Sequence, residues 1–182
     1  MKELSLNILD IAQNSVKARA SLIGIDLEAN GSLLTITVSD NGCGMKEEMV
    51  KNVTDPFCTS RTTRKVGLGI PFFKLAAEQT GGSFEISSKH EDDYPECHGT
   101  VTKAVFDMSH IDAAPLGDII TSIITLIQGM GNIDLVFTHK SEKLDVKLDT
   151  RELKEVLGGD IPLSSPDVLL WIKEFLEENY KI

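Results

Sequence analysis

The segment that most constrains the fold is Asp40-Asn41-Gly42-Cys43-Gly44, because it follows directly on a strand-like run, residues 32–39. That run is rich in Leu, Ile, Thr and Val, which is typical of a strand. A carboxylate at the end of a buried strand can accept a hydrogen bond from an exocyclic amine, and the glycines let the backbone turn tightly around it. Because Asp-Asn-Gly alone usually marks only a turn, its interpretation depends on the motifs before and after it.

Residues 2–20 are predicted to form an amphipathic helix with Asp10 and Asn14 one turn apart. At about 100° per residue, the aliphatic side chains cover one half of the helix. The polar stripe on the other half consists of Glu3, Asn7, Asp10, Asn14 and Lys17. A solvated helix face is the simplest explanation of such a stripe, although asparagine competes with the helix backbone for hydrogen bonds. An Asp–Asn pair can instead supply an oxygen ligand for Mg²⁺ and a carboxylate that orients water.

A third motif, Gly-Leu-Gly at residues 67–69, precedes a second predicted helix, residues 72–80. Pro71 is compatible with the first turn of that helix, and the glycines at 81–82 end it. Glycines that begin a helix expose backbone N–H groups at its positive end, which favours anion binding. Neither a P-loop nor a Rossmann fingerprint fits, because Gly-Lys-Ser/Thr is absent and no strand leads directly into the motif.

The motifs at residues 10–14, 40–44 and 67–69 have the order and rough spacing of the GHKL ATPases, the family of gyrase, heat-shock chaperone, histidine kinase and mismatch-repair proteins. Residues 55–61 resemble the phenylalanine-containing stretch before the ATP lid of histidine kinases, and residues 99–102 resemble the last strand of the domain. Each motif is weak by itself, whereas the five in sequence are specific.

The resemblance implies a two-layer α/β sandwich of helices on a mixed sheet, the Bergerat-type ATP-binding fold, over residues 1–108. It implies ATP and Mg²⁺ as cofactors, with Asn14 as the metal ligand and Asp40 as the acceptor for the adenine amine. Glycines shape the adenine pocket, residues 67–69 meet the phosphates, and a threonine helps to hold the base through water. The other implied nucleotide-binding residues are Gly42, Gly44, Arg61, Lys65, Gly67, Leu68, Gly69 and Thr100.

Asp10 occupies the position where members of the family that hydrolyse ATP or transfer its phosphate usually carry glutamate as the general base. Aspartate is one methylene shorter, so its reach towards an attacking water is reduced. We therefore expect either slow turnover with Asp10 as the catalytic residue or nucleotide binding without turnover. Residues 54–66, which include the basic cluster Arg61, Arg64 and Lys65, are expected to form a lid over the phosphates.

Composition is typical of a cytoplasmic globular protein, with 41% hydrophobic and 25% charged residues in a chain of 182. No signal peptide is visible, and the longest apolar run, residues 119–127, is too short to span a membrane. A net charge of −10 argues against binding to nucleic acid, since phosphate contacts need clustered Lys and Arg. Cys43, Cys58 and Cys97 form no CxxC pair and are interpreted as reduced packing residues.

Residues 115–182 are predicted to form a small second α/β unit of unknown role, which packs on the first domain because about seventy residues make only a modest core. Residue 139, a histidine, is expected on the surface of a strand, and Trp171 and Phe175 are expected in the core. The predicted elements of this unit are helix 116–130, strands 133–139 and 143–149, helix 151–157 and a last helix that begins at Ser165-Pro166-Asp167.

Three functional classes remain open. The first is a weak ATPase or regulatory switch that binds ATP or ADP with Mg²⁺ and acts on a protein partner. The second is a protein-serine kinase of the anti-sigma-factor type, and the third is a non-hydrolysing nucleotide-binding subunit of a larger complex. A sensor histidine kinase is disfavoured, because only 13 residues precede Asn14 and none of the four histidines lies on a convincing helix.

Overall fold

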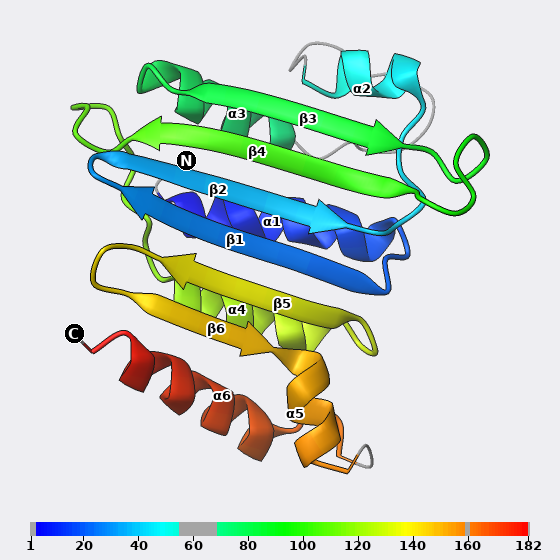
Figure 1. Cartoon of the computed structure of the whole chain (residues 1–182), viewed down its shortest axis with the longest axis vertical. Coiled ribbons are helices and arrows are strands. Elements are labelled where there is room, and N and C mark those ends of the chain that lie inside the picture. The colour runs from blue at the N-terminus through cyan, green and yellow to red at the C-terminus, as the bar shows by residue number, and fades with distance from the viewer. Residues whose placement is uncertain (1–2, 55–68, 159–160, 182) are drawn as a thin grey trace.

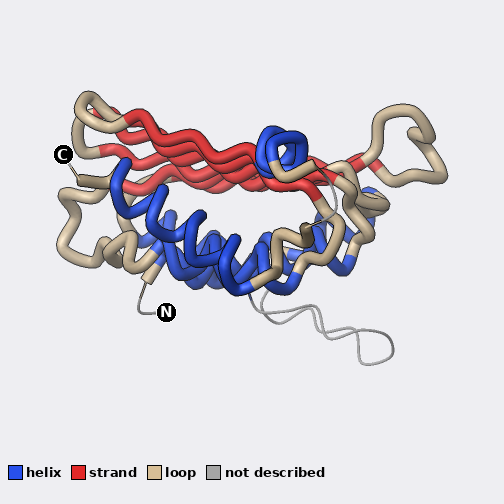
Figure 2. Tube along the Cα trace, turned by 90° about the horizontal axis from the view of Figure 1, so that it is seen from below, coloured by secondary structure: helices blue, strands red, loops and turns tan. Residues whose placement is uncertain are grey.

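The structure, a computed structural model, describes residues 3–54, 69–158 and 161–181. In these residues one mixed sheet of six strands forms the first layer, and helices on one of its faces form the second (Figures 1 and 2). The two-layer α/β sandwich predicted from the sequence is therefore confirmed. The elements are α1 (Leu4–Lys17), β1 (Leu22–Asn30), β2 (Leu33–Asp40), α2 (Glu47–Val53), α3 (Gly69–Gln79), β3 (Ser83–Lys89), β4 (Gly99–Asp107), α4 (Ile119–Gly129), β5 (Asp134–Lys140), β6 (Asp145–Asp149), α5 (Thr150–Val156) and α6 (Pro166–Asn179).

The strands lie in the order β3-β4-β2-β1-β5-β6 (Figure 1). All neighbours are antiparallel except β1 and β5, which run parallel. Neither β1 nor the short helix α2 was predicted from the sequence. For β1 a signal was present, because Ile23, Ile25 and Leu27 alternate with less buried residues in the period-2 pattern of a strand.

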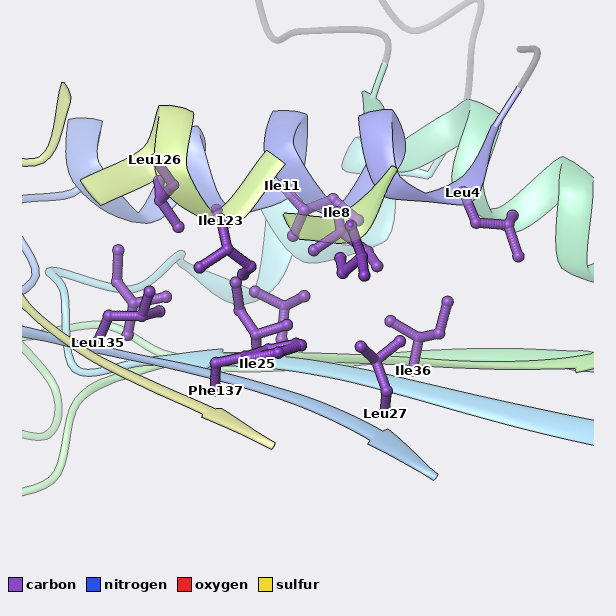
Figure 3. Packing of buried hydrophobic residues seen from close by; sticks show 14 of the residues in the cluster. Leu4, Ile8, Ile11, Ile25, Leu27, Ile36, Ile123, Leu126, Leu135 and Phe137 are labelled. Carbon is purple, nitrogen blue, oxygen red and sulfur yellow. The ribbon is translucent and has the colours of Figure 1, made fainter. Parts of the chain in front are cut away.

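The core lies between the sheet and the helices α1, α3 and α4. Ile8 and Ile11 of α1 and Ile123 of α4 point at the sheet, where Ile25 and Phe137 meet them (Figure 3). All five side chains are almost completely buried. Burial of an aliphatic or aromatic side chain of this size contributes about 1.5–3 kcal/mol, which explains why α1 holds a fixed orientation over the central strands.

The opposite face of the sheet is polar. Lys103, Thr37, Asp26 and Thr138 lie in one cross-strand row on that face, and Thr138 donates a hydrogen bond to Asp26 Oδ1 at 2.6 Å. Such alternation of apolar and polar side chains is typical of a sheet with one solvated face. Side chains on the helical face at the ends of the strands are therefore the ones that can form an enclosed site.

The two predicted units, residues 1–108 and 115–182, contribute strands to the same sheet. Residue 25 of β1 lies opposite residue 137 of β5, and α4 packs against α1. The loop before α4 also contacts the first turn of α1, where the backbone N–H of Leu4 donates to the Pro115 carbonyl at 2.9 Å. The helix α4 connects β4 to β5, two strands that both run parallel to β1, and so supplies the long crossover that parallel strands need. The division into residues 1–108 and 115–182 stays a prediction about folding units.

Two expectations for the C-terminal segment were wrong. His139 is buried because it shares the helical face of β5 with Leu135 and Phe137, and its Nδ1 lies 2.7 Å from the Tyr180 hydroxyl. Trp171 is 51% exposed, since other residues of α6 face the core. It stacks on Phe175 with the ring centroids 5.6 Å apart.

Candidate functional site

Asp40 ends β2 on the helical face of the sheet. It continues the buried row of Ile36 and Val38, where an apolar residue would be the usual choice. Its Oδ2 accepts a hydrogen bond of 2.6 Å from the Ser15 hydroxyl of α1, and its Oδ1 accepts one of 2.9 Å from the Gly42 N–H. A carboxylate has about four acceptor positions, so two such bonds orient Asp40 and leave capacity for a ligand donor.

The turn after Asp40 packs closely against the loop after β3. Gly44 has a φ of 66°, and a Cβ added to it would lie only 1.9 Å from the Lys89 carbonyl oxygen. Glycine is therefore required at this position by conformation and by space. Gly42, in the same turn, is buried against Ala18 at the end of α1. The two glycines of the sequence motif thus let the backbone pass around Asp40.

Asp10 and Asn14 lie one turn apart on α1, as predicted. Asp10 is exposed and Asn14 is partly buried, and the following residue, Ser15, contacts Asp40. Asn7, in the same polar stripe, is only 1% exposed. The stripe is therefore a packing surface at Asn7 and solvated at Asp10 and Lys17.

Gly69 begins α3 directly beside Asp10. A Cβ added to Gly69 would lie 3.1 Å from Asp10 Cβ and 3.7 Å from Asp10 Oδ2. The absence of a side chain therefore lets the N-terminus of α3, an 11-residue helix, approach the carboxylate of α1. Unpaired N–H groups at a helix N-terminus attract anions. A carboxylate and the N-terminus of a helix thus lie next to each other.

Thr100 lies opposite Asp40 on the neighbouring strand β4, so both side chains emerge on the same face. Its hydroxyl lies 2.8 Å from that of Ser88 on β3, and either oxygen can donate. Ser88 also accepts a hydrogen bond of 2.7 Å from the Met45 N–H. Thr100 is therefore tied through Ser88 to the turn that contains the glycines.

Ser15, Ser88 and His98 were not assigned to the nucleotide site from the sequence, although all three contact the region around Asp40. His98 Nδ1 lies 2.6 Å from the Gly42 carbonyl oxygen. A signal existed for Ser15 alone, because it follows Asn14 on the helix and stands near its inner face. The contacts of Ser88 and His98 join segments more than 40 residues apart, which no local pattern indicates.

The structure brings together Asp10, Asn14, Asp40, Gly42, Gly44, Gly69 and Thr100 on α1 and its neighbours. The remaining predicted ligands, Arg61, Lys65, Gly67 and Leu68, lie outside the described residues, and so does almost all of the predicted lid, residues 54–66. Their roles stay predictions. In the part of the chain that the structure describes, no helix is long and apolar enough to cross a membrane.

Residues 2–110 match the family described as Histidine kinase-, DNA gyrase B-, and HSP90-like ATPase. This match covers more than half of the chain, so the protein belongs to that family. The resemblance to the GHKL ATPases is thereby confirmed, and membership in this ATPase family implies ATP binding.

Similar proteins include the signal transduction histidine-protein kinase AtoS of Escherichia coli, 28% identical over 88 residues, which are 48% of this chain and 14% of AtoS. An uncharacterized sensor-like histidine kinase of Rhizobium meliloti is 30% identical over 88 residues, 44% of this chain and 17% of that protein. The chain thus spans less than a fifth of the length of these curated relatives. The ATPase domain of Aquifex aeolicus MutL, complexed with ADP, has a similar fold, with a TM-score of 0.55, 13% identity and coverage of 87% of this chain and 70% of that one.

Proposed function

We propose that the protein binds ATP with Mg²⁺ between α1, the end of β2 and the start of α3, and that it acts as a slow ATPase or nucleotide-dependent regulatory switch. One observation carries this proposal. The other two motifs meet α1 within or directly after the Asp10–Asn14 motif, since Gly69 lies against Asp10 and Asp40 accepts a hydrogen bond from Ser15, the residue after Asn14. Three weak sequence motifs, far apart along the chain, therefore lie around α1, which supports a single binding site.

At the base end, Asp40 accepts a hydrogen bond from the adenine amine. Its two bonds from Ser15 and Gly42 hold the carboxylate in one orientation, which supports selective rather than general acceptance of donors. Thr100, opposite Asp40 across the β2–β4 pair, contributes through a bridging water. Gly42 and Gly44 keep the backbone of the turn out of the space that the base needs.

At the phosphate end, the N-terminus of α3 faces the anionic groups. Gly69 supplies an approach without a side chain, and the helix contributes its positive end. Asn14, one turn from Asp10, supplies a neutral amide oxygen as a ligand for Mg²⁺. Among the residues that the structure describes, no group of three or more His, Cys, Asp or Glu side chains could hold a metal ion. Mg²⁺ commonly takes only one or two protein ligands and completes its shell with phosphate oxygens and water, so a single Asn14 ligand is sufficient.

Asp10 is the proposed general base. Its carboxylate is exposed on α1 beside the start of α3, where it can take a proton from a water or hydroxyl that attacks the terminal phosphate. Phosphoryl transfer depends mainly on positioning and on neutralisation of charge, and the short aspartate side chain reaches less far than glutamate. This argues for slow turnover in the isolated protein and for acceleration by a protein partner.

A second candidate function is phosphoryl transfer to a protein. The similarity to histidine kinases favours this function. The support is limited, because the match covers less than a fifth of those proteins. The net charge of −10 supports a protein as the partner rather than a nucleic acid. A non-hydrolysing binding subunit is the outcome expected if Asp10 never reaches the attacking group.

One experiment separates these functions. The purified protein is incubated with ATP labelled in the γ-phosphate, alone and with cell lysate, and free phosphate and protein-bound label are measured. Slow release of phosphate by the protein alone supports the ATPase, whereas label transferred to a lysate protein supports the kinase. Nucleotide binding with neither reaction supports the binding subunit. A protein that binds no adenine nucleotide with Mg²⁺ contradicts the proposal as a whole.

A further inference from the structure

The turn after β2 is held by a second loop, residues 90–98, which connects β3 and β4. The backbone N–H of Glu91 donates to the Cys43 carbonyl at 2.9 Å. Lys46 Nζ lies 3.3 Å from Asp92 Oδ2, but this pair is exposed and contributes little to stability. The backbone hydrogen bond, rather than the ion pair, therefore holds the two loops together.

Within this contact, His98 reaches the turn with its side chain. Its Nδ1 lies 2.6 Å from the Gly42 carbonyl oxygen. A carbonyl oxygen can only accept, so Nδ1 carries the proton and donates it. The other end of the same peptide unit is held as well, because the Cys43 N–H donates to the Ala18 carbonyl at 2.9 Å. Both polar groups of the Gly42–Cys43 peptide are thus bound, one by the β3–β4 loop and one by the end of α1.

The orientation of this peptide affects Asp40 through one residue, Gly42. Gly42 donates its own N–H to Asp40 Oδ1 at 2.9 Å, and it has no side chain to restrict its backbone. Without His98, the Gly42–Cys43 peptide would be held only by the Cys43 N–H, so Gly42 could rotate and withdraw its N–H from the carboxylate. Asp40 would then be oriented by Ser15 alone.

We propose that His98 is a positioning residue that sets the base selectivity of the site. This inference rests on the proposed function, in which Asp40 accepts from the adenine amine. Guanine presents a carbonyl oxygen where adenine presents that amine, so a fixed carboxylate would face another acceptor and reject it. A carboxylate that can turn away loses part of its preference for ATP and part of its repulsion of GTP, since hydrogen bonds weaken steeply with angle.

Calorimetric titration with ATP and with GTP, each with Mg²⁺, tests the inference on four variants and the wild type. In His98→Ala, we expect ATP affinity to fall about threefold to tenfold, the effect of one lost hydrogen bond, and the ATP:GTP ratio to fall with it. In His98→Asn, the amide nitrogen can occupy the position of Nδ1, so affinity and selectivity are retained. In His98→Gln, the amide nitrogen lies one bond further out and the loss resembles that of alanine.

The matched control is His90→Ala in the same loop. His90 Nδ1 accepts from the Asp92 N–H, within its own loop, so this variant should bind ATP and GTP like the wild type. Equal behaviour of the asparagine and glutamine variants, or equal losses in His90→Ala and His98→Ala, would overturn the role of His98 while the nucleotide site stands. If His98→Ala does not fold, the asparagine–glutamine comparison still decides. A wild type that binds ATP and GTP equally contradicts Asp40 as the base-recognition residue, and the inference with it.

Discussion

The Ser15 hydroxyl of α1 donates a hydrogen bond of 2.6 Å to Asp40 Oδ2 at the end of β2. This contact joins the helix that carries Asp10 and Asn14 to the strand that carries the proposed base acceptor. A shift of α1 would therefore move the groups proposed to act at the phosphates and also disturb the group proposed to bind the base. Because this bond orients Asp40, a substitution at Asp40 changes the orientation of the side chain as well as its charge.

Asp40→Asn should weaken ATP binding and leave the protein folded. The amide has one acceptor oxygen in place of two, so either Ser15, Gly42 or the adenine amine loses its partner. An unsatisfied buried polar group costs about 1–3 kcal/mol, which corresponds to roughly one to two orders of magnitude in affinity. Calorimetry with ATP and GTP measures the change. Asp26→Asn is the control, because Asp26 lies on the opposite face of β1. Equal affinity of the wild type for both nucleotides would contradict the assignment.

Asn14→Ala should remove the effect of Mg²⁺ on nucleotide affinity. An amide oxygen is a hard neutral ligand that suits an ion already bound to phosphates. ATP affinity is measured with Mg²⁺ and with EDTA, and the variant is expected to show little difference between the two. Gln13→Ala, an exposed neighbour on the same helix, should keep the wild-type difference. An Asn14→Ala protein that retains that difference would move the metal site elsewhere.

Asp10→Asn should lower the rate of ATP hydrolysis, while Asp10→Glu should raise it or leave it unchanged. Glutamate extends the carboxylate by one methylene towards the attacking water, and loss of a well-placed general base costs a factor of about 10²–10⁴. Phosphate release under saturating ATP measures the rates. Rapid turnover of both the wild type and Asp10→Asn would show that Asp10 has no catalytic role.

Gly44→Ala should destabilise the protein more than Gly31→Ala and should also weaken ATP binding. Both glycines have positive φ, at 66° and 59°, so alanine is strained by about 1–2 kcal/mol at either position. Only at Gly44 does the new Cβ collide with backbone, 1.9 Å from the Lys89 oxygen, whereas nothing lies within 4 Å at Gly31. Urea unfolding and calorimetry measure the two effects. Similar losses in the two variants would contradict the close packing of the turn.

Stability should fall when the pH drops below about 6.5, in part because of His139. Burial lowers the pKa of this imidazole below its ordinary value of 6.5, so the unfolded chain takes up the proton more readily than the folded one. The stabilisation is fully present above pH 6.5 and is lost as the pH falls towards the lowered pKa. Urea unfolding at pH 7.5 and 5.5 measures it. His139→Gln carries no titrating group there and should lose less stability over this interval, and equal losses would contradict the argument.

Local patterns in the sequence were sufficient to predict most helices and strands. The ends of the predicted helix 2–20 and of the predicted strand 32–39 agree with those of α1 and β2 to within three residues. Periodicities of 3.6 and 2 depend only on neighbouring positions, which is why they could be recognised in the sequence. The short helix α2 carries little apolar pattern, with Val53 as its buried residue, and was missed. His139 was misassigned because its environment depends on which face of β5 is covered.

By itself, the sequence determined the class of fold, the family and the order of the motifs at Asp10–Asn14, Asp40–Gly44 and Gly69. Only the tertiary structure decided that β5 pairs in parallel with β1, that Ser15 holds Asp40, and that His98 reaches Gly42 across 56 residues. The physical reason is the range of the interactions. Periodicity and turn chemistry act between close neighbours in the chain, whereas these contacts join segments that are distant in the chain and adjacent only in the packed structure.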